Sequence, residues 1–135
     1  MPELYKGRSI AKGIGEGEAL VTSQPLSFFG GIDPDSGIIR DRGHELFGVK
    51  ISGKILVLPP CKGSTAGTWT LARLSENGVA PSAIIIGKSD VIVTAGVIMG
   101  QIPTVDNFDF DPTMKFKTGQ KLRVNGNEGT VEVVP

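Results

Sequence analysis

The segment from Cys61 to Gly67 combines the residue types in this chain that are best suited to chemistry, in the order Cys-Lys-Gly-Ser-Thr-Ala-Gly. Free backbone N–H groups ahead of a helix, together with the helix dipole, favour an anion. Gly63 would let the backbone approach such an anion closely, and the hydroxyls of Ser64 and Thr65 would reach it at low steric cost. The segment therefore predicts an anion-binding or catalytic loop.

The same hydroxyl groups could serve structure alone. Ser64 or Thr65 could cap the helix that follows, because serine and threonine are favoured N-cap residues. The spacing and the order of lysine and hydroxyl residues differ from those of a P-loop, which excludes a nucleotide-phosphate site of that type. Residues 61–67 by themselves therefore leave two interpretations open, a catalytic loop and a helix cap.

The single cysteine and the single histidine could also carry chemistry. To act as a nucleophile, Cys61 would need a base, and the only histidine, His44, lies in a separate polar stretch. We interpret Cys61 as a small buried apolar side chain and His44 as a solvated or hydrogen-bonded surface residue. One cysteine also excludes an internal disulfide, and it excludes a thiolate-bound zinc site or iron–sulfur cluster held by this chain alone.

Two strands and a helix must position the loop. Residues 54–58 and residues 83–86 are short apolar runs, typical of strands that are buried on both faces. Between them, residues 68–76 bring apolar side chains near one helical face, and Asn77-Gly78 supplies a left-handed stop. The side chains on this face are Trp69, Leu71, Ala72 and Leu74. The loop would then lie between the carboxyl end of a strand and the start of a helix, where ligands bind in α/β sheets.

Shorter elements surround this unit. Further strands are expected at residues 18–22, 97–99, 102–105, 120–124 and 130–134. The last two form a hairpin by their turn residues, and a second hairpin is expected near the N-terminus. Ser89-Asp90 could cap a short helix toward Ala95, although residues 91–93 fit a strand equally well. We predict an α/β fold, a β/β/α domain with few helices whose mixed sheet could form a partly closed barrel.

Composition limits the class of protein. The chain has 135 residues, enough for one domain over residues 1–135 with a core of its own. Its 14 Lys+Arg balance its 14 Asp+Glu, which argues against a nucleic acid as partner. The apolar runs are far shorter than the ~20 residues that span a membrane, and the first residues lack the apolar stretch of a signal peptide. We expect a cytoplasmic protein that contacts no membrane.

A second unusual segment is Phe28-Phe29-Gly30-Gly31, which precedes an Asp-Pro turn. A Gly-Gly pair lets the backbone adopt positive φ or approach another group closely. Two interpretations are open. The aromatic side chains could face the core beside a turn, or the segment could form a loop at a ligand-binding or subunit surface.

These motifs resemble, over nearly the whole chain, the small swivelling component of the aconitase-X family. The matching segments are GEGEALV (15–21), PLSFFGGIDPDSG (25–37), KILVLP (54–59), KGST (62–65) and APSAI (80–84). The resemblance implies a swivelling domain that forms a heterodimer with a large aconitase-X subunit. An iron–sulfur cluster is expected in that large subunit and no cofactor or metal in this chain, and the loop at Phe28 to Gly31 would contribute to the subunit interface or the active site.

The resemblance also implies roles for individual residues. In aconitase relatives, the first serine of a Gly-Ser-Ser-Arg stretch in the swivel domain is the catalytic base. Gly63-Ser64-Thr65 matches the first part of that stretch, which puts this role on Ser64 and makes Gly63 and Thr65 substrate-binding residues. Ala66 stands where aconitase has a substrate-binding arginine, so the anionic groups must be recognised differently, and Lys62 is a candidate for this contact.

The implied reaction is a dehydration. In archaea, stand-alone small chains of this family belong to a hydro-lyase that removes water from (R)-5-phosphomevalonate to give trans-anhydromevalonate 5-phosphate, in a modified mevalonate route to isoprenoids. The substrate would be this small phosphorylated hydroxy acid, and activity would require the large subunit. Other members resemble dehydratases of cis-3-hydroxy-L-proline, so that substrate is the alternative. A phosphocarrier fits less well because residues 61–67 contain no histidine, and a non-catalytic module would use Ser64 only as a helix cap.

Overall fold

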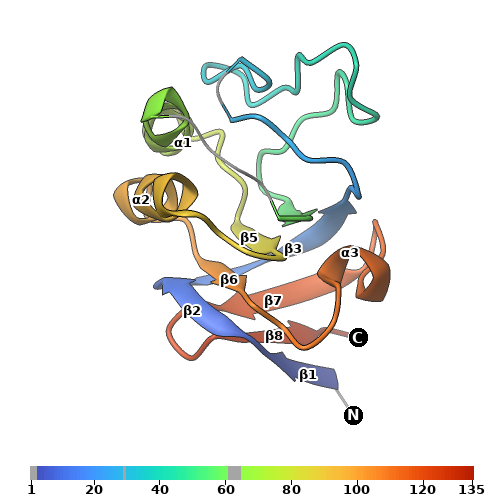
Figure 1. The fold of residues 1–135 in the computed structure, drawn as a ribbon. Coiled ribbons are helices and arrows are strands. Elements are labelled where there is room, and N and C mark those ends of the chain that lie inside the picture. Colours follow the sequence, from blue (N-terminus) through green and yellow to red (C-terminus); the bar gives the residue numbers. More distant parts are fainter. Residues whose placement is uncertain (1–2, 29, 61–64) are drawn as a thin grey trace.

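The computed structural model describes residues 3–28, 30–60 and 65–135 (Figure 1). Within these ranges, the strands are β1 (Glu3–Lys6), β2 (Arg8–Ala11), β3 (Ile14–Val21), β4 (Ile55–Leu58), β5 (Ala83–Ile86), β6 (Thr104–Asp106), β7 (Lys121–Asn125) and β8 (Thr130–Val133). The helices in the same ranges are α1 (Thr65–Glu76), α2 (Val91–Met99) and α3 (Pro112–Lys115).

The eight strands form one mixed sheet in the order β1-β8-β7-β3-β4-β5-β6-β2. The strands β3, β4, β5 and β6 pair with one another in parallel. The pairs β2/β6, β3/β7, β7/β8 and β1/β8 are antiparallel. The predicted α/β fold with a mixed sheet is therefore confirmed, and strand pairing does not close the sheet into a barrel. The β7–β8 hairpin at the C-terminus is also as predicted.

The N-terminal hairpin was a wrong prediction. β1 and β2 are separated only by Gly7, yet they form the two opposite edges of the sheet. β1 pairs with β8 and β2 pairs with β6, so both strands belong to one extended stretch along the lower side of the molecule (Figure 1). Between them, the Gly7 N–H donates to the carbonyl of Gly129 at 2.8 Å, which keeps the chain running straight instead of turning back.

The central strands have a hydrophobic cluster on each face, which explains why their sequences are apolar throughout. Alternate residues of a strand point to opposite faces. Leu56 and Leu58 of β4 belong to the cluster under the helices, whereas Ile55 and Val57 belong to a cluster with β7, β8 and Phe116. Both faces are thus covered, as the continuous apolar runs indicate, and burying each such side chain contributes roughly 1.5–3 kcal/mol to folding.

Helices α1 and α2 lie side by side on one face of the sheet (Figure 1). The strand predicted at residues 97–99 is instead the end of α2. The run Val91-Ile92-Val93 favours a strand locally, but the Asp90 carboxylate caps the helix by accepting from the Val93 N–H at 2.8 Å. Val93 and Val97 then face the core together, and this packing overrides the local β-propensity.

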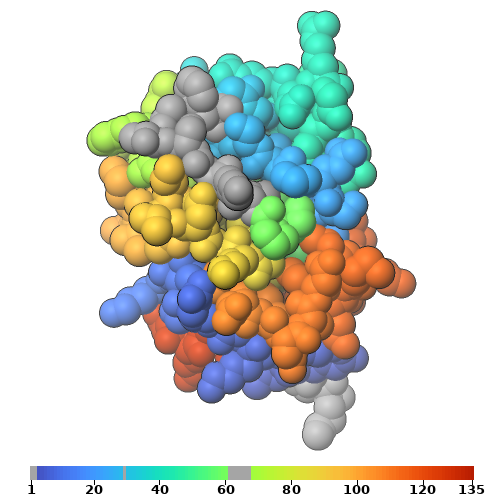
Figure 2. Space-filling model, in the orientation of Figure 1, coloured from blue at the N-terminus to red at the C-terminus, as the bar shows by residue number. Residues whose placement is uncertain are grey.

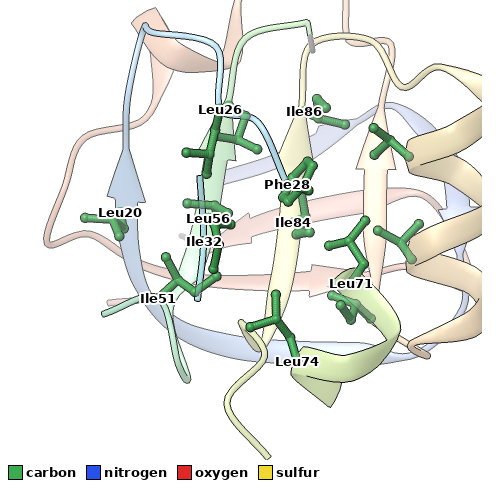
Figure 3. Packing of buried hydrophobic residues seen from close by; sticks show 14 of the residues in the cluster. Leu20, Leu26, Phe28, Ile32, Ile51, Leu56, Leu71, Leu74, Ile84 and Ile86 are labelled. Atoms are coloured by element: carbon green, nitrogen blue, oxygen red, sulfur yellow. The ribbon is translucent and has the colours of Figure 1, made fainter. Parts of the chain in front are cut away.

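The long connection between β3 and β4 covers the rest of this core. Its buried apolar side chains are Leu26, Phe28, Ile32, Ile39 and Ile51. Phe28 and Ile32 point toward Leu56 and Ile84 of the sheet (Figure 3). The described parts of this connection contain isolated bridges and turns, with no regular strand or helix. Apolar contacts hold it against the sheet and α1, together with hydrogen bonds such as that from Nδ2 of Asn77 to the Pro34 carbonyl at 2.8 Å.

Candidate functional site

The parallel strands β3, β4, β5 and β6 end at one edge of the sheet, here called the carboxyl edge, which is formed by the residues that follow Val21, Leu58, Ile86 and Asp106. The predicted loop follows β4 and precedes α1, as expected from the sequence. The helix was predicted to begin at residue 68, but α1 begins three residues earlier, at Thr65, so residues 65–67 belong to the helix and not to the loop. The other predicted residues of the loop, Lys62, Gly63 and Ser64, lie outside the described residues, as does Cys61, and their roles stay predictions.

The connections after β4, β5 and β6 contact one another at the carboxyl edge. The Gly87 N–H donates to the carbonyl of Leu58 at 3.0 Å, and the Gly87 carbonyl accepts from the Asn107 N–H at 3.2 Å. A Cβ atom on Gly87 would lie 2.8 Å from Cδ of Pro60, so these two connections touch. On the face drawn in Figure 2, the described start of the first connection is green and the second connection is yellow. The β5–α2 connection therefore contacts Pro60, the last residue described before the predicted loop.

A buried carboxylate fixes this connection. Asp106 is fully buried, and its oxygens accept from Nε and Nη2 of Arg8, both at 2.9 Å, and from the Ser89 N–H at 2.8 Å. The hydrogen bond to Asp106, and then the attraction of its charge, raise the pKa of the Arg8 guanidinium above its usual value. The network ties β2 and β6 to the residues that follow β5. Sequence analysis missed it, because Arg8 and Asp106 are distant in the chain.

We expect Asp106→Asn to lower the free energy of unfolding by about 1–3 kcal/mol, because the amide NH₂ would face an N–H donor and leave a buried donor without a partner. Chemical denaturation of the isolated chain, followed by circular dichroism, measures this change. Asp109→Asn changes an exposed aspartate on the connection between β6 and α3 and should stay within about 0.5 kcal/mol of the wild type. Equal stability of both variants would contradict the role assigned to the buried network.

His44 is not on the surface, contrary to our interpretation of the sequence. Its side chain is buried, Nδ1 accepts from the Leu46 N–H at 3.0 Å, and Nε2 lies 3.3 Å from the carbonyl of Gln24. Because Nδ1 accepts, Nε2 carries the proton and donates. The predicted hydrogen bonding is therefore present, and both ring nitrogens bond to backbone groups of the connection between β3 and β4.

A polar cluster joins this histidine to the end of β3. The buried Thr22 hydroxyl donates to the Glu45 carboxylate, and the side-chain oxygen of Gln24 accepts from the Glu45 N–H at 2.8 Å. Thr22 directly follows β3, so this cluster borders the carboxyl edge. Thr22 and Gln24 lie about twenty positions before His44 and Glu45 in the sequence. No local motif connects the two parts of the cluster.

The segment at Phe28 to Gly31 combines core and surface. Phe28 is buried, in agreement with the interpretation that it faces the core. Gly30 is exposed and has φ +83°, and a Cβ atom on Gly31 would lie 2.3 Å from the carbonyl oxygen of Ser27. Both positions therefore require glycine. Phe29 lies outside the described residues. Among the described residues, the Gly30 carbonyl accepts from Nε of Arg40 at 3.2 Å, and the interface role of this loop stays a prediction.

An open groove of about 680 Å³ lies far from the predicted loop. It is lined by Ile10, Ala11, Lys12, Gly13, Ile98, Gln101 and Asn127. These residues surround the end of β2, the end of α2 and the turn between β7 and β8, at the edge opposite to the carboxyl edge. The groove has few polar groups that could do chemistry, so the carboxyl edge is the better candidate site.

The donor set of the described residues does not fit a resident metal. No group of three or more His, Cys, Asp or Glu side chains comes together in these parts of the chain. An iron–sulfur cluster therefore has no set of ligands among them, and no reaction step through such a group is assigned to them. In the same ranges, no helix is long and apolar enough to cross a membrane.

The fold and its carboxyl edge define a small swivelling α/β domain. The profile described as the aconitase X swivel domain matches residues 4–133, so the chain belongs to the aconitase X swivel domain family. The resemblance inferred from the sequence motifs is thereby confirmed.

Relatives of nearly the same length support this assignment. The "Phosphomevalonate dehydratase small subunit" of Thermococcus gammatolerans is 46% identical over 129 residues, which cover 96% of each chain. The protein of the same description from Methanosarcina acetivorans is 42% identical, over 99% of this chain and 93% of the relative. A crystal structure of Thermococcus kodakaraensis aconitase X in its holo form contains a chain with a TM-score of 0.92 and 45% identity, covering 98% of this chain and 99% of that chain.

Proposed function

We propose that this chain is the small subunit of a hydro-lyase that dehydrates (R)-5-phosphomevalonate to trans-anhydromevalonate 5-phosphate in the modified mevalonate route to isoprenoids. The observation that carries the proposal is the match over 96% of both chains to a relative described as a phosphomevalonate dehydratase small subunit. The solved aconitase X structure supports it, because the swivel fold there is shared over nearly the full length.

In this proposal, the chain supplies the base and one wall of the active site. The reaction removes a proton from C2 and a hydroxyl group from C3 of the substrate. Ser64 takes the C2 proton, while Lys62, Gly63 and Thr65 hold the substrate at the loop that follows β4. Departure of the C3 hydroxyl falls to a group of the large subunit, the partner in a heterodimer. The cluster expected in the large subunit supplies Lewis-acid chemistry there.

The proposal places the complex in the cytoplasm. The substrate carries a phosphate and a carboxylate, and charged groups cross the apolar interior of a membrane at high cost. The substrate therefore stays in the compartment where it is made, and its dehydratase is expected there.

The test is an assay of the purified heterodimer on two substrates. The complex should dehydrate (R)-5-phosphomevalonate with a kcat/KM at least about tenfold above that for cis-3-hydroxy-L-proline, because a lost charge-assisted contact costs ~1.5–3 kcal/mol. Ultraviolet absorbance of the new conjugated double bond follows the first reaction, and chromatography of the product follows the second. The reverse preference would assign the chain to the hydroxyproline enzymes, and a phosphohistidine at His44 would point to a phosphocarrier.

A further inference from the structure

The connection between β5 and α2 carries an unpaired cation at the carboxyl edge. Lys88 is exposed and has no hydrogen bond or ion pair within the described residues. Arg8 lies at the same edge, but the fully buried Asp106 carboxylate binds it through two hydrogen bonds and neutralises its charge. The net positive charge contributed by these three residues is therefore that of Lys88.

The backbone on both sides of Lys88 is held in place. Gly87 is bonded to Leu58 on one side and to Asn107 on the other, and the Ser89 N–H donates to Asp106. The next residue, Asp90, caps α2. Because the backbone is fixed before any ligand arrives, an anion that contacts the ammonium group need order only the lysine side chain. This arrangement suits a binding residue better than a freely moving surface lysine.

The position of Lys88 fits the distal end of the proposed substrate. Neighbouring strands lie about 4.8 Å apart, and β4 and β5 are neighbours. In phosphomevalonate, C3, C4 and C5 separate the phosphate from the reacting C2. A substrate with C2 at the loop after β4 can therefore place its phosphate at the connection after β5, whose Gly87 contacts Pro60 of the loop's first residues.

We propose that Lys88 binds the phosphate of the substrate, which leaves Lys62 for the carboxylate beside C2. This inference rests on the proposed function, because it takes the loop after β4 as the place of C2. The phosphate contact distinguishes phosphomevalonate from an amino acid substrate such as hydroxyproline. It also supplies a cation at an active site in which Ala66 replaces the arginine of aconitase.

The first test compares variants of the assembled heterodimer. Lys88→Ala should raise the KM for phosphomevalonate about ten- to a hundredfold, as expected for one charge-assisted contact, while kcat changes less than about threefold. Lys88→Arg should restore most of the affinity, because it keeps the charge. Lys12→Ala is the matched control, since Lys12 is an exposed lysine at the opposite edge and should leave KM unchanged. An unchanged KM in Lys88→Ala would overturn the proposal.

The second test asks which anionic group Lys88 contacts. With mevalonate, the same acid without the phosphate, Lys88→Ala should leave kcat/KM at the wild-type value, whereas Lys62→Ala should lower it. Equal losses on both substrates in Lys88→Ala would assign Lys88 to the carboxylate and overturn the phosphate contact.

A third measurement stays informative if the complex does not act on phosphomevalonate, which would refute the proposed function. Inorganic phosphate binding is then measured by calorimetry on the wild-type and Lys88→Ala heterodimers. A dissociation constant at least about tenfold weaker in the variant supports a phosphate site at Lys88 on its own account. Equal affinities, or no binding by the wild type, overturn it.

Discussion

Replacement of Ser64 by alanine is expected to lower kcat of the assembled dehydratase by about 100- to 10,000-fold, the usual contribution of a general acid–base group. A serine hydroxyl is a weak acid, and it can act as a base only if its alkoxide is stabilised. The fold provides a reason for such stabilisation, because α1 begins at Thr65 and the positive end of a helix dipole lies at its start. Steady-state kinetics of the purified heterodimer measure the effect.

The controls for this variant separate catalysis from structure. Assembly of Ser64→Ala with the large subunit should stay near normal in gel filtration, because the loss of a helix cap costs only ~1 kcal/mol. Thr65→Ala should have the milder effect on kcat, since that hydroxyl would at most orient substrate or cap the helix. If Ser64→Ala keeps more than about a tenth of the activity and Thr65→Ala loses all of it, the two roles are reversed. Two fully active variants would place the base in the large subunit.

The second large effect concerns the isolated chain, which we expect to be colourless, free of iron and inactive as a dehydratase. It has a single cysteine, and its described residues contain no group of metal ligands. Co-expression with the large subunit should give a brown, oxygen-sensitive complex with full activity. Iron analysis, absorbance spectra and the dehydration assay of both preparations measure the difference. Dehydration by the purified chain without a partner would contradict this expectation.

The parts of the fold that were predicted well have strong local signals. β5 was placed correctly at both ends and β4 to within one residue, because each is a continuous apolar run with cores on both of its faces. The β7–β8 hairpin follows from the turn residues between two alternating segments. In each case, the pattern within a few residues determines the structure.

The wrong predictions depend on contacts between distant residues. Nothing local in residues 3–11 shows that this stretch pairs with β8 at one end and with β6 at the other. Trp69 was expected near the buried face of α1, but its side chain is 60% exposed, because Leu71 and Leu74 occupy the core side of that helix. Neither feature is visible in the periodicity of its own segment.

The candidate site likewise has one part with a local sequence signal and one part that depends on contacts between distant residues. The segment between the buried strand β4 and helix α1 could be placed from the sequence, because the βαβ pattern is continuous along the chain, while the site roles of residues 62–65 stay predictions. The Arg8–Asp106 pair could not, because its members are 98 positions apart and meet only when β2 pairs with β6. Lys88 belongs to no sequence motif, and its proposed role follows from the residues that surround it in the folded chain.

The pairing of β1 with β8 has a consequence for how the protein is made. β1 is synthesised long before its partner β8, which spans residues 130–133. This edge of the sheet can therefore be completed only after residues 130–133 have left the ribosome. Until then, the exposed edges of β1 and β7 could pair with other chains. A nascent chain of this kind benefits from rapid release or from a chaperone that shields its first strand.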